Sequence, residues 1–280
     1  MTWLTEVFEP SFMQRALIAS LLAVAVTSLV GTWVVLRGLA FLGDAISHGV
    51  IPGLALAVLW GFSLILGALA AALVMAIAVA FVSSRTTVRE DTGIGLLFVG
   101  MLSLGVVIVS RTRAFATEVT SLLFGDVLGV TWSDIRLQLV AVAVVVVVSV
   151  VMFRPFMALT FNRDKALTLG MRPGVSHIVL MALLAVSIVA SFETVGTLLV
   201  FGLLIGPPAT AGLVVRRVPS MILLSMLFGA LAVVAGLVVS FHYSTAGGAT
   251  MALFSVLIFF VVLAIREAIT ALSTAPAVAH

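Results

Sequence analysis

An aspartate and a histidine stand four residues apart in the segment Gly43–Gly53, which reads GDAISHGVIPG. After Asp44 no Asp, Glu, Lys or Arg occurs until Arg85, so the pair borders a long stretch built for lipid. An ionised carboxylate there is costly unless it faces a partner or a wet cavity, and it is a functional hypothesis by default. Positions i and i+4 share one helix face, so Asp44 and His48 are expected to point at the same object. A divalent metal ion binds both a carboxylate oxygen and an imidazole nitrogen.

Simpler interpretations of the pair stay open at this point. Asp44 could pair with Arg37 or cap a helix, and His48 could bond to a neighbouring backbone group. Pro52 and Gly53 favour a site, because a proline frees a carbonyl and bends the helix, which is tolerated in lipid only where protein or a cavity satisfies the backbone. One Asp and one His are too few ligands for an ion. A two-fold homodimer whose pairs face the axis is predicted to supply four.

The composition is that of an integral membrane protein. Apolar residues make up 63% of the 280 and charged residues 9%, whereas about a quarter of a typical soluble domain is charged. The chain has no cysteine, which excludes disulfides and thiolate metal sites. The net charge of +3 comes from basic residues spread along the chain, which act as topology signals, so nucleic acid is not expected as a partner.

The uncharged stretches predict an all-helical fold, since an open sheet cannot satisfy its backbone in lipid. A spanning helix needs about 20 apolar residues, so the two longest stretches are expected to hold two helices each. Their breaks are predicted near Trp60–Phe62 and at His242–Gly248. The count is about nine transmembrane helices, or eight if one short segment is re-entrant, within a single transmembrane domain over residues 1–280. The stretches are Ala16–Leu36, Ala45–Ser84, Thr92–Ser110, Leu137–Phe153, Pro173–Phe192, Thr194–Val215 and Val218–Ile265.

The basic residues predict the orientation in the membrane, because cytoplasmic loops carry an excess of Lys and Arg. The densest cluster lies in the loop between the fifth and sixth helices, which is therefore assigned to the cytoplasm. Alternation then places the N-terminus outside and the C-terminus inside. The inner residues are Arg37, Arg85, Arg89, Arg154, Arg163, Lys165, Arg172, Arg216, Arg217 and Arg266, and the outer ones Arg15, Arg111, Arg113 and Arg136.

That cytoplasmic loop, residues 154–174, is a second candidate for function. Asn162 or Asp164 can cap a short helix, and Gly170 suits its C-terminal end. A short amphipathic helix on this face is either a docking element for another protein or part of an ordinary polar loop.

Other polar and helix-breaking residues are weaker candidates. Gly202 and Gly206 have a spacing that permits close helix approach, and Pro207 and Pro208 after them are expected to break the helix near the transport path. Helix packing is preferred here over contact with a substrate. Glu193 and His242 are placed at the outer surface and are not expected to be ligands.

Several catalytic motifs are absent from the sequence. It has no G-x-x-x-x-G-K-[ST] phosphate loop, and Lys165 is its only lysine, so the chain is not expected to hydrolyse ATP. HExxH and GxSxG motifs are also missing. The chain is predicted not to be an enzyme and to hold no permanent cofactor.

The run Phe41–Gly53 resembles the signature of the zinc/manganese permease family of ABC importers. Weaker matches follow in order along the chain: Glu90–Gly95, Leu123–Leu128, Ala166–Gly170, Val195–Val200 and Pro207–Ala211. The resemblance implies a bacterial inner-membrane permease, related in architecture to cobalamin and siderophore importers. It implies a homodimer, two cytoplasmic ATPases and an extracytoplasmic metal-binding protein. Asp44 and His48 match the positions expected to meet the ion. The coupling helix that would contact the ATPase maps onto Arg163, Asp164, Lys165, Ala166, Leu169 and Gly170.

One rival function and the choice of metal remain open. Asp44 and His48 could instead form a proton relay in a secondary metal transporter, which would need no ATPase. Carboxylate and imidazole suit zinc and manganese alike, and the general affinity order places zinc above manganese. Zinc is therefore favoured as the cargo, with manganese next.

Overall fold

The computed structural model of the chain describes residues 6–85, 90–110, 125–161, 167 and 170–274, and the described secondary structure is entirely helical. A short 3₁₀ turn, η1 (Glu6–Phe8), precedes the first long helix. The helices are α2 (Ser11–Leu36), α3 (Ala40–Gly49), α4 (Ile51–Trp60), α5 (Leu64–Arg85), α6 (Glu90–Val109), α8 (Trp132–Val151), α9 (Phe153–Phe161), α11 (Pro173–Val195), α12 (Thr197–Val214), α13 (Val218–Tyr243) and α14 (Gly247–Thr274).

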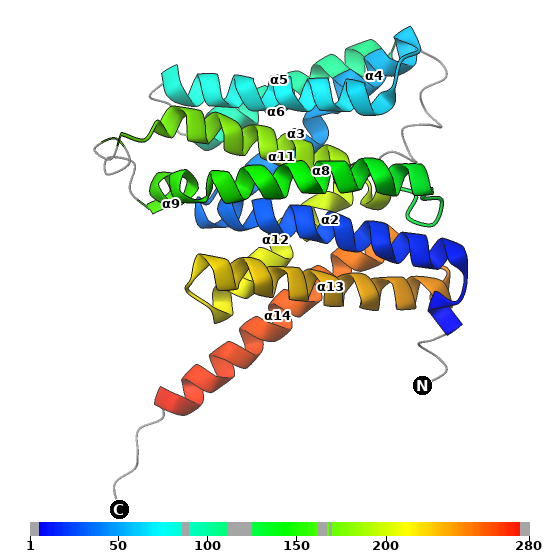
Figure 1. Cartoon of the computed structure of the whole chain (residues 1–280), viewed down its shortest axis with the longest axis vertical. Coiled ribbons are helices and arrows are strands. Elements are labelled where there is room, and N and C mark those ends of the chain that lie inside the picture. The colour runs from blue at the N-terminus through cyan, green and yellow to red at the C-terminus, as the bar shows by residue number, and fades with distance from the viewer. Residues whose placement is uncertain (1–5, 86–89, 111–124, 162–166, 168–169, 275–280) are drawn as a thin grey trace, which may run out of the picture.

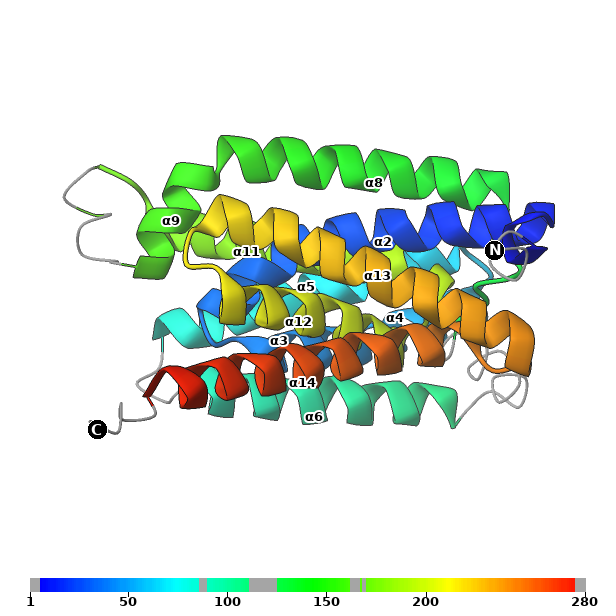
Figure 2. The same cartoon turned by 90° about the horizontal axis from the view of Figure 1, so that it is seen from below.

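The long helices lie side by side with their ends at two opposite faces (Figure 1). Eight segments of the described chain are long and apolar enough to cross a membrane, with α3 and α4 together forming one of them. The shorter apolar segment Val200–Val214, in α12, corresponds to the seventh predicted helix, Thr194–Val215. The first described turn, η1, and the C-terminal end of α14 lie at opposite ends of the bundle, as an odd number of crossings requires (Figure 2). The expected multi-pass helical fold is confirmed.

α2 is the central helix. It contacts α8, α11, α12 and α13, and two thirds of its most apolar stretch is buried inside the protein. Trp33 in α2 is fully buried and meets Phe153 and Phe156 edge to face at ring-centroid distances of 5.5 and 5.6 Å. Such aromatic pairs stabilise a core beyond the area they bury. The core therefore sits around α2, and α3 is packed beside it against α5, α6, α11 and α12.

Two predicted boundaries have clear local causes. The break after Trp60 falls at Gly61, whose φ of 69° is in the left-handed region that glycine adopts without strain. The fifth span begins at Trp132 and not at Leu137, because Thr131 and Asp134 form a capping box that starts α8. The predicted start at Leu137 is too late because the prediction counted only uncharged residues, whereas Asp134 belongs to the first turn of α8.

The expected break at Pro207 and Pro208 is wrong. Both prolines lie inside α12, which continues to Val214. A proline at position i leaves the carbonyl at i−4 without its helical donor, and for Pro208 this carbonyl belongs to Leu204. The Leu204 oxygen lies against the Cα of Gly31 in α2, so close that a Cβ on Gly31 would overlap it. We infer that packing against α2 holds the helix through the double proline, because a neighbouring helix can compensate freed backbone groups in membranes.

Candidate metal-ion site

Asp44 and His48 lie on α3, the first half of a membrane span that is interrupted at Val50. Pro52 occupies the first turn of α4, where its missing N–H is best tolerated. Because Pro52 cannot donate to the His48 carbonyl, that oxygen accepts instead from the N–H of Val50. The proline thus separates α3 from α4 just after the two candidate ligands, as the sequence indicates.

Glycine contacts hold both halves of this span against their neighbours. A Cβ at Gly43 would come within 2.6 Å of Leu204 in α12, and one at Gly49 within 3.2 Å of Met75 in α5. The closest crossing joins Gly53 in α4 to Gly67 in α5, where a Cβ on either residue would overlap the carbonyl oxygen of the other. Backbones that approach this closely are typical of small residues at membrane-helix interfaces.

Only one stripe of α3 is accessible from outside the protomer. Between Phe41 and Val50 the partly exposed residues are Phe41, Asp44 and His48, and all the others are buried. The spacing i, i+3, i+7 places these three on a single helix face. The Asp44 side chain is 33% exposed and that of His48 20%. Both candidate ligands therefore face a surface that their own chain does not close.

The two side chains are arranged to share one object. His48 Nε2 and Asp44 Oδ1 lie 3.5 Å apart, which is long for a hydrogen bond between them. An ion bound at about 2.1 Å to each of two donors at the angles of tetrahedral or octahedral coordination separates those donors by about 3 to 3.5 Å. The observed pair accordingly has a spacing that a transition-metal ion can bridge without moving the helix.

A phenylalanine missed in the sequence contacts His48. The Phe98 ring, on α6, meets the imidazole edge to face at a centroid distance of 5.6 Å and also contacts Phe41 at 5.9 Å. It limits the orientations open to the imidazole. The helical spacing could have identified Phe41, but no pattern in the sequence connects Phe98 with a residue fifty positions earlier.

The other predicted functional residues are not brought to this pair. No group of three or more His, Asp or Glu side chains able to hold a metal occurs in the described part of the chain. His242 lies in the last turn of α13, and not in the turn after it, and its Nδ1 lies 2.9 Å from the Val238 carbonyl. Glu193 belongs to the last turns of α11. Among the residues described, Asp44 and His48 thus form a pair without a third His, Asp or Glu grouped with them.

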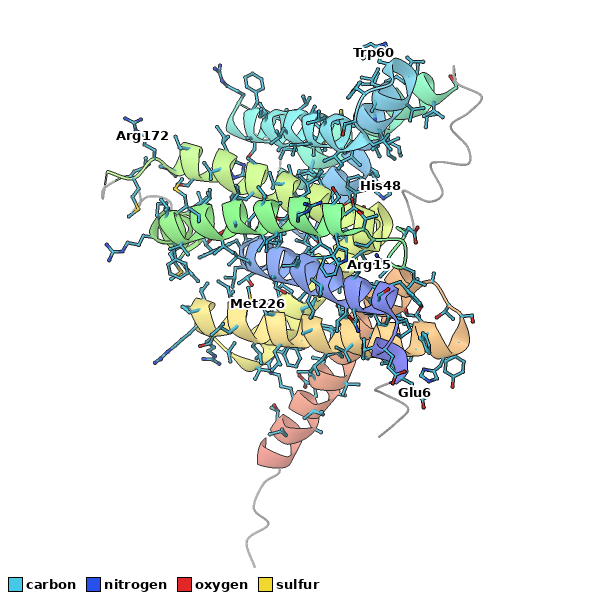
Figure 3. All side chains as sticks on the ribbon, turned by 45° about the vertical axis from the view of Figure 1, so that its right-hand side comes forward. Glu6, Arg15, His48, Trp60, Arg172 and Met226 are labelled. Atoms are coloured by element: carbon cyan, nitrogen blue, oxygen red, sulfur yellow. The ribbon has the colours of Figure 1, made fainter. Side chains whose placement is uncertain are left out.

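Most of the predicted coupling helix, namely Arg163, Asp164, Lys165, Ala166 and Leu169, lies outside the described residues. Gly170 is described, with a φ of 72° and an N–H that donates to the Leu167 carbonyl at 3.0 Å. This is the conformation that glycine favours where a helical turn ends. Arg172 follows it at the end of the bundle opposite Glu6 and Arg15 (Figure 3).

The fold and the pair together define a class, that of polytopic membrane permeases with a polar site on an interrupted helix. Within that class, residues 9–266 match the ABC 3 transport family, and the chain belongs to this family. It is therefore the membrane-spanning permease subunit of an ABC transporter and is not itself catalytic. This membership decides against the proton-coupled secondary transporter.

Similar proteins agree with this assignment. The chain is 36% identical over 248 residues to the manganese transport system membrane protein MntC of Halalkalibacterium halodurans, covering 89% of this chain and 85% of that protein. It is 33% identical over 260 residues to the chelated iron transport system membrane protein YfeD of Yersinia pestis, covering 93% and 87%. Both of these proteins are named for the transport of a metal.

Solved structures share the fold. PsaBC from Streptococcus pneumoniae, solved in complex with a Fab, superimposes with a TM-score of 0.82 at 31% identity, covering 93% of this chain and 94% of that one. A transporter described as of metal-chelate type, in an inward-facing conformation, has a TM-score of 0.68 at 19% identity and covers 90% and 86%. The second likeness shows the fold alone, which is the architecture expected from the sequence.

Proposed function

We propose that this chain imports Mn²⁺ as the permease subunit of a bacterial metal ABC importer, with Asp44 and His48 contacting the ion in transit. The observation that carries this proposal is the position of the pair on the one accessible stripe of α3. Ionisable side chains within a membrane span cost free energy of desolvation, and this cost is accounted for when they bind a hydrophilic cargo.

Manganese is preferred here over the zinc favoured from the sequence. The affinity order of divalent metals says which ion binds most tightly, whereas selectivity in cells also depends on geometry and on metal availability. Relatives named for manganese and iron favour the metals that bind most weakly in that affinity order. Zinc remains as a competitor that the next experiment tests directly.

Deleting the gene should lower cellular manganese under manganese starvation, and a plasmid copy should restore it. Metal content measured by mass spectrometry in parallel zinc and iron starvation decides the cargo. Loss of zinc with unchanged manganese would overturn the choice of manganese and restore zinc. Unchanged content of all three metals, with the protein shown to be present in the parent strain, would contradict import of any of them.

We further propose the orientation and partners of the complete importer. Ten of the fourteen Lys and Arg residues belong to sequence segments assigned to the cytoplasm, which supports an outer N-terminus and an inner C-terminus. Two ATPase subunits would bind residues 163–170 at the inner face, within the loop 154–174 of a single transmembrane domain. A binding protein would deliver the ion at the outer face. The conformation of Gly170 is consistent with a helix that ends there.

The working unit is proposed to be a homodimer in which the α3 stripes face one shared path. A single protomer leaves the ion with two protein ligands, which poorly replace its water shell, whereas two protomers supply four. The exposed fraction of Asp44 and His48 supports this, because the surface that they face is left for something outside the protomer.

Cysteine at Phe41 should cross-link two protomers, since this side chain is 40% exposed and lies on the same stripe as the pair. The chain has no native cysteine, so a band of twice the monomer mass under oxidising conditions has one origin. Val150→Cys is a matched control, because Val150 is 71% exposed on α8, at the opposite edge of the bundle from α6 and α14 (Figure 2). A dimer band from Val150→Cys with none from Phe41→Cys would refute the shared path.

A further inference from the structure

The imidazole of His48 lacks the support that a metal-binding histidine usually has. A histidine ligand almost always donates its second ring N–H to a carboxylate, a carbonyl or water, and this hydrogen bond fixes the orientation of the ring. His48 Nε2 lies 3.5 Å from Asp44 Oδ1. No described residue forms a hydrogen bond with the other ring nitrogen, Nδ1. Another contact therefore has to hold the ring if it is to present one nitrogen to an ion.

Phe98 supplies such a contact from α6. Its ring meets the imidazole edge to face at a centroid distance of 5.6 Å and an interplanar angle of 70°. The same ring meets Phe41 at 5.9 Å and 66°. Phe41 and His48 are seven residues apart on one face of α3, so Phe98 bridges two side chains of that helix. The imidazole is thus confined by Phe98 from α6 and by Asp44 from its own helix.

The position of Phe98 is fixed because α6 is packed on both sides of it. Ile94, one turn before Phe98, is 1% exposed. Gly105, two turns after it, lies against α4, where a Cβ would come within 2.8 Å of Ile51 Cγ2 and 3.3 Å of the Pro52 nitrogen. Ile94, Phe98 and Gly105 have the spacing of one helix face. Only 17% of the most apolar stretch of α6 is buried inside the protein, so this packed face is what holds Phe98 against α3.

We propose that Phe98 is a positioning residue for transport, which holds the His48 imidazole with Nε2 toward Asp44 so that the ion meets two preoriented ligands. The inference rests on the proposed function, in which Asp44 and His48 contact the ion, but it does not depend on which metal is carried. Phe98 has no donor atom for an ion and acts through His48. A site binds precisely only when packing locks the rotamers of its ligands. Without the Phe98 ring, binding an ion has to restrict the rotation of the imidazole first, which costs conformational entropy.

The test measures metal binding by the full-length permease purified in detergent, through the rise of its unfolding midpoint in separate titrations with Mn²⁺ and Zn²⁺. Phe98→Leu removes the ring and keeps an apolar side chain. For the ion that stabilises the wild type, this variant should raise the half-saturating concentration about tenfold, at the lower end of the effect of outer-sphere substitutions at metal sites. Phe98→Tyr keeps the ring and should have a half-saturating concentration close to that of the wild type.

Phe260→Leu is the matched control. The Phe260 ring on α14 meets Phe259 edge to face at 5.5 Å and 77°, so this substitution removes an aromatic contact of similar geometry that does not involve His48. It should leave the half-saturating concentration unchanged. A purely structural role of Phe98 would lower the metal-free unfolding midpoint of Phe98→Leu and leave its half-saturating concentration unchanged, which would overturn the proposal. Equal weakening in Phe98→Tyr and Phe98→Leu would also overturn it, because the ring would then not be the cause.

Asp44→Asn in the same titration separates this proposal from the proposed function. If the wild type shows no response to either metal, or if Asp44→Asn responds as strongly as the wild type, the ion site itself is contradicted, and with it the role of Phe98. Loss of the response in Asp44→Asn with a wild-type response in Phe98→Leu contradicts the role of Phe98 alone. If Phe98→Leu does not fold, Phe98→Met takes its place with the same outcomes, because methionine also lacks a ring and adapts to irregular space.

Discussion

Metal uptake should fall by at least about 100-fold when Asp44 is replaced by asparagine or His48 by glutamine, since even outer-sphere substitutions at metal sites cost about 10- to 100-fold. Each substitution nearly keeps the size and polarity of the side chain but removes the carboxylate or the imidazole that is proposed to contact the ion. The fold should survive, because both side chains are partly exposed and α3 is held by other contacts. Uptake of radioactive manganese in the complemented deletion strain measures the effect, together with the amount of permease in the membrane.

Two matched controls separate this effect from a general loss of charge. Asp126→Asn removes an exposed carboxylate whose Oδ1 accepts from the N–H of Gly129. His242→Gln removes a histidine at the end of α13. Both should keep wild-type uptake. Normal uptake by Asp44→Asn at normal permease levels would rule out the assignment of the ion site.

Valine at Gly53 should prevent accumulation of folded protein. Its Cβ would overlap the Gly67 carbonyl oxygen and come within 2.7 Å of the Ala71 Cβ, and a backbone group cannot move aside as a side chain can. Overpacking typically costs about 1–3 kcal/mol and sometimes more, and this position belongs at the upper end. The yield of monodisperse protein and its unfolding midpoint report the change.

Gly100→Val is the control for the intrinsic effect of valine in a membrane helix. Apart from its own helical turns, no described atom lies within 4 Å of a Cβ at Gly100, which is exposed on α6. This variant should match the wild type in yield and in unfolding midpoint. If Gly53→Val also matches the wild type, the close crossing of α4 and α5 does not hold the span in place.

Much of this architecture could be predicted because a backbone in lipid has to form its hydrogen bonds internally. Long apolar stretches have to be helices, and the break at Gly61 is readable from the turn residues beside it. The pairing of Asp44 with His48 follows from helical spacing alone. These features depend on residues that are close together in the sequence.

What escaped prediction depends on neighbours distant in the sequence. Pro207 and Pro208 look like a break until the Leu204 carbonyl is seen against Gly31 of another helix. The contact of Phe98 with His48 and the buried faces of α3 likewise require the packed bundle. Local spacing identified the candidate ligands, but only packing showed which way they face.

The interruption at Val50 divides this span into two short helices, α3 and α4, which pack against their neighbours in different ways. At Gly53, α4 meets the backbone of α5, whereas α3, which carries Asp44 and His48, meets softer side-chain contacts at Gly43 and Gly49. A small tilt of α3, which carries the candidate ligands, therefore need not disturb α4. In the proposed transport cycle the path would then open on one side of the ion while it stays closed on the other, as a transporter requires and a channel does not.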